Sequence, residues 1–355
     1  MIKLFSPYVP EESYDGLKRV LSGGQLAQGA QVDKFEKIFS QEFNVKHPIS
    51  LNSGTAALEL AYELLDLGPG DEVITTPLTC AATNLPLLRR GVKIVWADVL
   101  KHTLCINPLD VRSKMTEKTK AIVQVHLGGV KADVGKCHVP VISDAAQALG
   151  IFNGDFTCCS FQAIKHITTG DGGILVCPNK AMYDKARLLR WFGIDRTNTI
   201  KDDWTSYRTR MMSFDIELAG TKRHMNDIDA TLGLFGLRSY TKIIEHRKKL
   251  FDVYRRRIKK NWAKFIFLVD GMENVNWLTT VIVDRRDDFA KLMWTHGIEV
   301  NIVQVRNDLY KIFGGKRADL PVLNQIEDKY VSLPIGMHVS EEEVNYICDV
   351  IEKGW

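Results

Sequence analysis

The sequence lacks the features that mark secreted and membrane-spanning chains. Its seven cysteines are odd in number and have neither paired metal-ligand spacing nor the density of a small disulfide-bonded scaffold, which indicates reduced thiols. The first residues contain no apolar core of a signal peptide, and no stretch is long or apolar enough to span a bilayer. We therefore expect a cytoplasmic protein without a membrane partner, and we predict no metal site.

An excess of charge of one sign is also absent. Lys and Arg together number 47 against 43 Asp and Glu, a formal net charge of +4, which gives no reason to expect a nucleic-acid partner. The chain has 355 residues, 45% of them hydrophobic. This length exceeds what one hydrophobic core usually supports, so the sequence predicts two domains.

Short apolar segments rich in β-branched residues recur between residues 72 and 177 and predict buried strands. These segments cover residues 72–75, 93–97, 121–127, 139–142, 158–161 and 173–177. A helical pattern at 56–67 precedes them, and others lie between them, for example at 108–115, where Pro108 suits the first helical position. Strands separated by helix-sized segments predict a mostly parallel, doubly wound α/β sheet.

Beyond residue 180 the pattern is mainly helical. Helices are predicted at 182–191 and 226–237, followed by a longer helix with an apolar face that includes Phe251, Tyr254, Ile258 and Trp262. We interpret its basic face as solvated. That face carries Arg247, Lys248, Lys249, Arg255, Arg256 and Arg257.

The last third of the chain mixes strand and helix. Residues 275–283 predict a strand, and residues 340–353 predict an amphipathic helix that begins with the capping pattern of Ser340 and Glu343. We therefore divide the chain into a large α/β domain, residues 1–240, and a smaller α+β domain, residues 241–355. Residues 192–221 show little periodicity, which is typical of a functional or interfacial segment.

A lysine and an aspartate stand out among the polar residues. Asp144 closes an apolar strand segment, and Lys165 follows the next predicted strand in a Gly- and Thr-rich stretch. A lysine that can form a Schiff base and a carboxylate that can hold a pyridinium nitrogen are what pyridoxal 5′-phosphate (PLP) requires of a protein. Either residue alone is more often a solvated surface charge.

The other needs of PLP can be sought separately. Gly54 and Thr55 open a predicted helix, whose backbone N–H groups can bind a phosphate, and Ser160 can add a hydroxyl. Asp144 lies at the carboxyl end of a strand, where ligands bind in open α/β sheets. Gln147 could face the phenolic oxygen of the cofactor.

Two further residues are ambiguous. Cys80 is placed by its spacing where a partner for the face of the cofactor ring is expected. His126 ends another strand on the same edge, so both an active-site role and a structural role stay open.

Several motifs together resemble the DegT/StrS-type sugar-nucleotide aminotransferases of PLP fold type I. They lie at residues 53–58, 68–74, 120–129, 144–147, 160–173, 222–228 and 333–338. The resemblance covers nearly the whole chain. It implies a mostly parallel, seven-stranded sheet flanked by helices, a smaller C-terminal domain and a homodimer with two shared active sites.

The resemblance also assigns roles to residues. Lys165 would bind PLP covalently and move protons, Asp144 would hold the pyridine nitrogen, and Gln147 would contact the ring oxygen. The phosphate would be bound by Gly54, Thr55 and Ser160. His224 occupies the position of a phosphate donor that relatives supply from the partner subunit, usually as Asn or another polar residue. The position of Cys80 is usually aromatic, and a thiol is a smaller, polarizable contact.

The implied reaction moves an amino group from glutamate to a nucleotide-linked 4-keto-6-deoxyhexose, with C4 favoured over C3. A branch that removes the C3 hydroxyl typically has histidine in place of the lysine, so Lys165 argues against it. Transamination of a cyclitol and a non-catalytic PLP-binding regulatory protein are further alternatives. Arg306 and Tyr310 are candidate substrate-binding residues, or else part of a packing strand and loop, and the nucleotide (UDP, dTDP or GDP) is not assigned.

Overall fold

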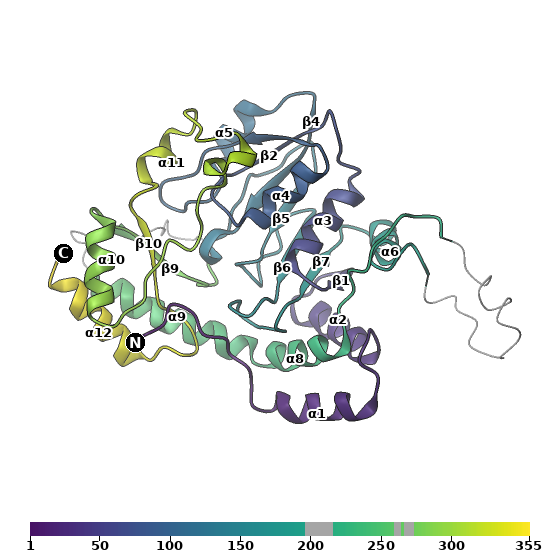
Figure 1. Cartoon of the computed structure of the whole chain (residues 1–355), viewed down its shortest axis with the longest axis horizontal. Helices are drawn as coiled ribbons and strands as arrows, with labels where there is room; N and C mark the ends of the chain where they lie inside the picture. Colours follow the sequence, from purple (N-terminus) through teal and green to yellow (C-terminus); the bar gives the residue numbers. More distant parts are fainter. Residues whose placement is uncertain (196–215, 259–263, 266–272) are drawn as a thin grey trace, which may run out of the picture.

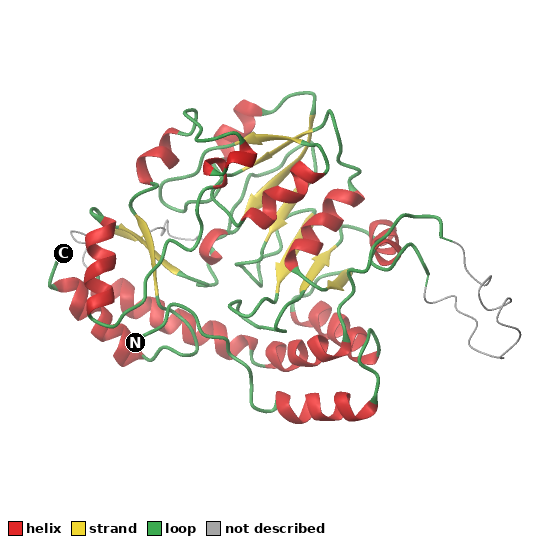
Figure 2. Cartoon of the chain, in the orientation of Figure 1, coloured by secondary structure: helices red, strands yellow, loops and turns green. Residues whose placement is uncertain are grey.

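The computed structural model describes residues 1–195, 216–258, 264–265 and 273–355. Within these residues, seven strands form one central sheet in the order β1-β7-β6-β5-β4-β2-β3 (Figures 1 and 2). The strands are β1 (Pro48–Leu51), β2 (Glu72–Thr75), β3 (Lys93–Trp96), β4 (Thr119–Val125), β5 (Val141–Asp144), β6 (Phe156–Ser160) and β7 (Gly173–Val176). All neighbours are parallel except at β7, which pairs antiparallel with both β6 and β1. The predicted α/β fold with a seven-stranded sheet is confirmed.

Each of the six predicted strand segments overlaps a strand of this sheet, and β2 has the predicted bounds. The strand β1 was not predicted; its four residues are all buried but include Pro48 and Ser50. Two polar or ring-constrained residues in so short a segment weaken the apolar pattern. Its place in the sheet is set by its pairing with β7, which is more than a hundred residues away in the chain.

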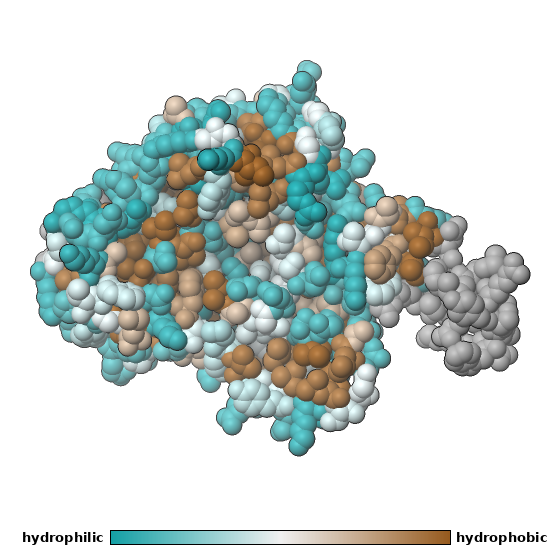
Figure 3. All heavy atoms as spheres, viewed as in Figure 1, coloured by the Kyte–Doolittle hydropathy of each residue, from teal (hydrophilic) through white to brown (hydrophobic). Residues whose placement is uncertain are grey.

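Helices cover both faces of the sheet (Figure 1). The helix α3 (Gly54–Leu64) packs against β6 and β7, and its N-cap Ser53 accepts a hydrogen bond from the Ala56 N–H at 3.0 Å. Other helices near this sheet are α4 (Ala81–Arg89), α5 (Pro108–Lys114) and α6 (Lys180–Leu189). The helix α2 (Ala30–Glu42) packs against α8 (Asp227–Arg238), and α1 (Ser13–Gly23) lies against α8 on its other side. Apolar residues gather on the surface along α8 and α1 in Figure 3. Leu21 of α1 is exposed.

A second sheet lies beside the first and is antiparallel. Its order is β10-β9-β8, from β8 (Lys264–Phe265), β9 (Thr279–Ile282) and β10 (Tyr330–Leu333). The helices of this part are α9 (Tyr240–Arg257), α10 (Arg286–Thr295), α11 (Pro321–Ile326) and α12 (Glu341–Glu352). The capping box predicted for α12 is present, because the Ser340 hydroxyl accepts from the Glu343 N–H and the Glu343 carboxylate accepts from the Ser340 N–H. None of the helices in the described residues is long and apolar enough to cross a membrane.

The two sheets share one apolar cluster. It joins Ile74 and Trp96 of the large sheet to Val281 and Leu333 of the small one. The chain start also reaches the small sheet's side of the molecule, where Ile2 bridges to Ile298. The boundary near residue 240 stays a prediction, and the two parts are packed together over a continuous core.

The expectation of a wholly solvated basic face on α9 was wrong at Arg247. Its side chain is buried, and its Nη1 donates to the carbonyl oxygens of Trp277 at 2.9 Å and Ile335 at 2.7 Å. The helical pattern cannot reveal this, because the partners come from distant loops. The helix ends at Arg257, and Trp262 lies outside the described residues.

Candidate active site

A cavity of about 270 Å³ opens at the carboxyl ends of β5 and β6, beside the N-terminus of α3. Seven of the predicted site residues line it: Gly54, Thr55, Cys80, Asp144, Gln147, Ser160 and Lys165. They come from segments spread over more than a hundred residues of the chain. The fold therefore brings together the residues that the PLP hypothesis required.

The lysine sits on a tight turn after β6. The Lys165 N–H donates to the Gln162 carbonyl at 2.9 Å, and the Thr169 N–H closes the loop by donating to Phe161 at 2.9 Å. Burial lowers the pKa of Lys165 to about 8, while the nearby Asp144 and Cys80 oppose that shift. A lysine whose pKa approaches neutrality can be both nucleophile and proton carrier.

The carboxylate of Asp144 is held by two donors at the end of β5. The Thr83 hydroxyl donates to Oδ2 at 2.7 Å, and the Ala146 N–H donates to Oδ1 at 3.1 Å. Burial raises the pKa of Asp144 above its usual value, whereas these two hydrogen bonds and Lys165 act in the opposite direction. A buried carboxylate oriented in this way is suited to pair with a buried cation such as a pyridinium.

An anion cradle forms where α3 meets β6. The Ala56 N–H is capped by Ser53, so the N–H groups of Gly54 and Thr55 are the first-turn donors that line the cavity. A Cβ built on Gly54 would lie 2.8 Å from the Cβ of Ser160, so only glycine lets the two segments approach this closely. Backbone donors, a hydroxyl and a helix N-terminus together fit a phosphate group.

Gln147 is oriented by its amide oxygen, which accepts from the Gly128 N–H at 2.7 Å. Its NH₂ group is then left to donate, and the residue lines the cavity. The phenolic oxygen of PLP accepts hydrogen bonds, so the NH₂ group of Gln147 also fits this cofactor.

The three predicted substrate-binding residues do not line this cavity. His126 is fully buried, its Nδ1 accepts from the Ala132 N–H at 2.9 Å, and burial lowers its pKa to about 3. Arg306 is 1% exposed and pairs with the buried Asp308 at 2.6 Å. Tyr310 is exposed on a neighbouring surface. Their substrate roles stay predictions.

His224 also lies outside the cavity, with its ring edge-on to Trp191 at a centroid distance of 4.4 Å. Its predicted role requires a partner subunit, and it stays a prediction.

Two residues of the site were missed by the sequence analysis. Trp277, from the segment before β9, lines the cavity, and its ring centroid lies 4.2 Å from the Nζ of Lys165. Thr83, in the first turn of α4, donates to Asp144, which lies 61 residues further along the chain. No local pattern marks either residue, because each acts through a contact that is distant in sequence.

Comparisons with known proteins identify the family of this chain. The family model of the DegT/DnrJ/EryC1/StrS aminotransferases matches residues 7–352. The chain belongs to this aminotransferase family. Members are PLP-dependent, and structural neighbours of this chain are sugar aminotransferases. The chain is accordingly a PLP-dependent sugar aminotransferase.

Similar proteins match over almost their full length. The spore coat polysaccharide biosynthesis protein SpsC of Bacillus subtilis is 31% identical, over 98% of this chain and 94% of SpsC. A dTDP-4-dehydro-2,3,6-trideoxy-D-glucose 4-aminotransferase of Saccharopolyspora spinosa is 28% identical, over 99% of this chain and 96% of that protein. The crystal structure of the sugar aminotransferase CalS13 from Micromonospora echinospora is 29% identical, covers 100% of both chains and superposes with a TM-score of 0.92.

Proposed function

We propose that this chain transfers an amino group from glutamate to C4 of a nucleotide-linked 4-keto-6-deoxyhexose, as a cytoplasmic homodimer with shared active sites. The observation that carries the proposal is the convergence of Lys165, Asp144 and the Gly54–Ser160 anion cradle on one cavity. The preference for C4 is supported by the relative whose name specifies a 4-aminotransferase acting on a dTDP-linked 4-dehydro sugar.

Each residue has a defined task in this reaction. PLP, when bound, supplies the electron sink that makes an α-proton of the amino acid acidic. Lys165 would hold the cofactor covalently and, when not attached to it, would carry the proton at its Nζ. Asp144 would keep the pyridine nitrogen protonated through its carboxylate. Gly54, Thr55 and Ser160 would bind the phosphate, and Gln147 would donate to the ring oxygen.

The position of His166 speaks against the dehydratase alternative. That branch typically has a histidine at the lysine position, and here the histidine beside Lys165 does not line the cavity. Its Nε2 lies 3.0 Å from the Val275 carbonyl, and burial lowers its pKa to about 3. His166 therefore anchors the turn to the neighbouring segment, while Lys165 faces the cavity.

The test begins with borohydride reduction of the PLP-loaded protein and mapping of the pyridoxyl group. We expect the label on Lys165, and a label on another lysine would contradict the assignment of Lys165 as the PLP-binding residue. The protein is then given glutamate, which should convert PLP to pyridoxamine phosphate in wild type and not in Lys165→Met. Lys242→Met, which makes the same change at an exposed lysine, is the matched control and should retain this half-reaction.

Substrate specificity is tested separately with UDP-, dTDP- and GDP-linked 3-keto and 4-keto sugars. NMR of the product distinguishes amination at C4 from amination at C3. Loss of the C3 hydroxyl without net amination would contradict the proposal and favour the dehydratase.

A further inference from the structure

Trp277 is fixed from several directions. Its indole Nε1 donates to the Ile164 carbonyl at 2.9 Å, its ring stacks on Phe5 at a centroid distance of 5.4 Å, and its own carbonyl accepts from Arg247. The side chain is 1% exposed. Swinging the ring aside would break its hydrogen bond to Ile164 and its stacking on Phe5.

The backbone around Trp277 is docked onto the turn that follows β4. The Val275 N–H donates to Gly129 and the Leu278 N–H donates to Gly128, both at 3.0 Å. A Cβ on Gly129, which has a φ of 100°, would lie 2.7 Å from the backbone nitrogen of Trp277. This glycine therefore allows a segment of the small domain to place its tryptophan beside the large domain's lysine.

The ring and the lysine are tied to the same turn. Nε1 bonds to the carbonyl of Ile164, the residue immediately before Lys165, and the Nζ of Lys165 lies 4.2 Å from the ring centroid. This distance is well inside the range of a cation–π contact. Because the indole is anchored to the turn itself, movement of the turn carries ring and amine together.

We propose that Trp277 is a positioning residue that holds the Lys165 ammonium over its indole face whenever that amine is not attached to the cofactor. The proposal rests on Lys165 being the reactive lysine of the proposed function. The contact with the ring stabilises the charged form of the amine, whereas burial favours the neutral form. Trp277 would thus set both the place of the amine and the fraction that is protonated.

Other charged and titratable groups around the Lys165 amine also affect whether it is protonated. Asp144 at the end of β5 and Cys80 before α4 favour the charged amine, and Asp171 lines the same cavity. Arg247 lies behind Trp277, and the buried His166 stays neutral near pH 7. Those groups are retained in a Trp277 variant, so a change in titration of Lys165 reports on the ring.

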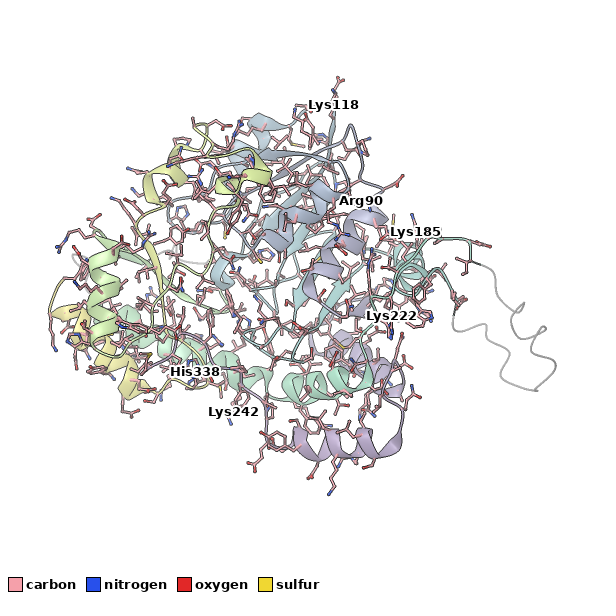
Figure 4. All side chains as sticks on the ribbon, in the orientation of Figure 1. Arg90, Lys118, Lys185, Lys222, Lys242 and His338 are labelled. Atoms are coloured by element: carbon pink, nitrogen blue, oxygen red, sulfur yellow. The ribbon has the colours of Figure 1, made fainter. Side chains whose placement is uncertain are left out.

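The experiment measures how the reactivity of Lys165 depends on pH. Full-length protein stripped of PLP is labelled competitively with fluorodinitrobenzene from pH 6 to 11, and peptides are quantified by mass spectrometry. Lys118 and Lys242 point outward (Figure 4) and serve as exposed reference lysines. In Trp277→Leu the labelling midpoint of Lys165 should fall by about 0.5 to 1.5 pH units.

Two variants serve as controls. Trp277→Phe keeps an aromatic face and should stay within about 0.3 pH units of wild type. Trp294→Leu removes an exposed tryptophan of α10 and should leave the midpoint unchanged. An unchanged or higher midpoint in folded Trp277→Leu would overturn the proposal.

If Trp277→Leu does not fold, fluorinated tryptophans placed at position 277 keep the shape and weaken the ring's negative face. A midpoint that falls stepwise with fluorine number supports the proposal, and a constant midpoint overturns it. Neither result depends on the sugar substrate, and the borohydride label on Lys165 tests the proposed function independently.

Discussion

The Thr83 hydroxyl donates a 2.7 Å hydrogen bond to Oδ2 of Asp144, and both side chains are buried. Because the only proton of that hydroxyl is directed at the carboxylate, the Thr79 hydroxyl, 2.8 Å away, acts as donor to Thr83. Two hydroxyls in series thus stabilise the charged form of a carboxylate whose burial favours the neutral form.

Thr83→Val removes this hydrogen bond while keeping the shape of the side chain. The pKa of Asp144 should rise further, and the affinity for PLP should fall on the order of tenfold to a hundredfold. The measurement is the PLP dissociation constant from absorbance titration. Thr83→Ser keeps the hydroxyl and should bind PLP nearly as wild type does; equal losses in both variants would contradict the role of the hydrogen bond.

Gly54→Ala tests the anion cradle. The added Cβ would press on Ser160 at 2.8 Å, so the cradle must widen and PLP affinity should fall by at least about tenfold, at a cost of about 1–3 kcal/mol in stability. Gly23→Ala is the matched control, because a Cβ there meets nothing within 4 Å. Unchanged PLP binding by Gly54→Ala would argue that the phosphate lies elsewhere.

The pH dependence of stability follows from Lys165. Its pKa is lowered to about 8 from 10.5, so the unfolded chain binds more protons between these values. Burying Lys165 therefore costs no stability above pH 10.5, where the amine is neutral in both states. The cost grows as the pH falls and is complete below about 8, where the amine is charged in both states. PLP-free Lys165→Met should be more stable than wild type at pH 7, with the difference shrinking toward pH 10.5, as measured by urea unfolding. A constant difference would count against this linkage.

Substitution of Arg306 separates its predicted role in substrate binding from its structural role in ion pairs. The guanidinium bonds to both oxygens of Asp308 and reaches Glu327 at 2.7 Å. Arg306→Met leaves the buried Asp308 without this partner and should cost about 3–5 kcal/mol of unfolding free energy. The exposed Arg285→Met is the control and should change stability by less than about 1 kcal/mol. A higher KM for the sugar at wild-type stability would instead support substrate contact.

Much of the large sheet could be predicted because its strands are short apolar segments and its helices carry local signals. The helix start at Ser53 and Gly54 is readable from a few adjacent residues. Arg247 was wrongly predicted to be solvated because its partners are distant in the sequence. They are carbonyl oxygens of Trp277 and Ile335, in loops that only the tertiary fold places beside the helix.

The sequence by itself determined six of the seven strands of the large sheet, the family, and the choice of Lys165 and Asp144 as candidate PLP residues, because residue type and local spacing carry that information. Only the tertiary structure decided that Trp277 faces the lysine, that Thr83 holds the aspartate and that Arg306 is buried in an ion pair. The contacts of Trp277 and Thr83 join residues dozens to more than a hundred positions apart, and the burial of Arg306 depends on how its loop packs. No local sequence pattern specifies which distant residues will contact Trp277, Thr83 or Arg306.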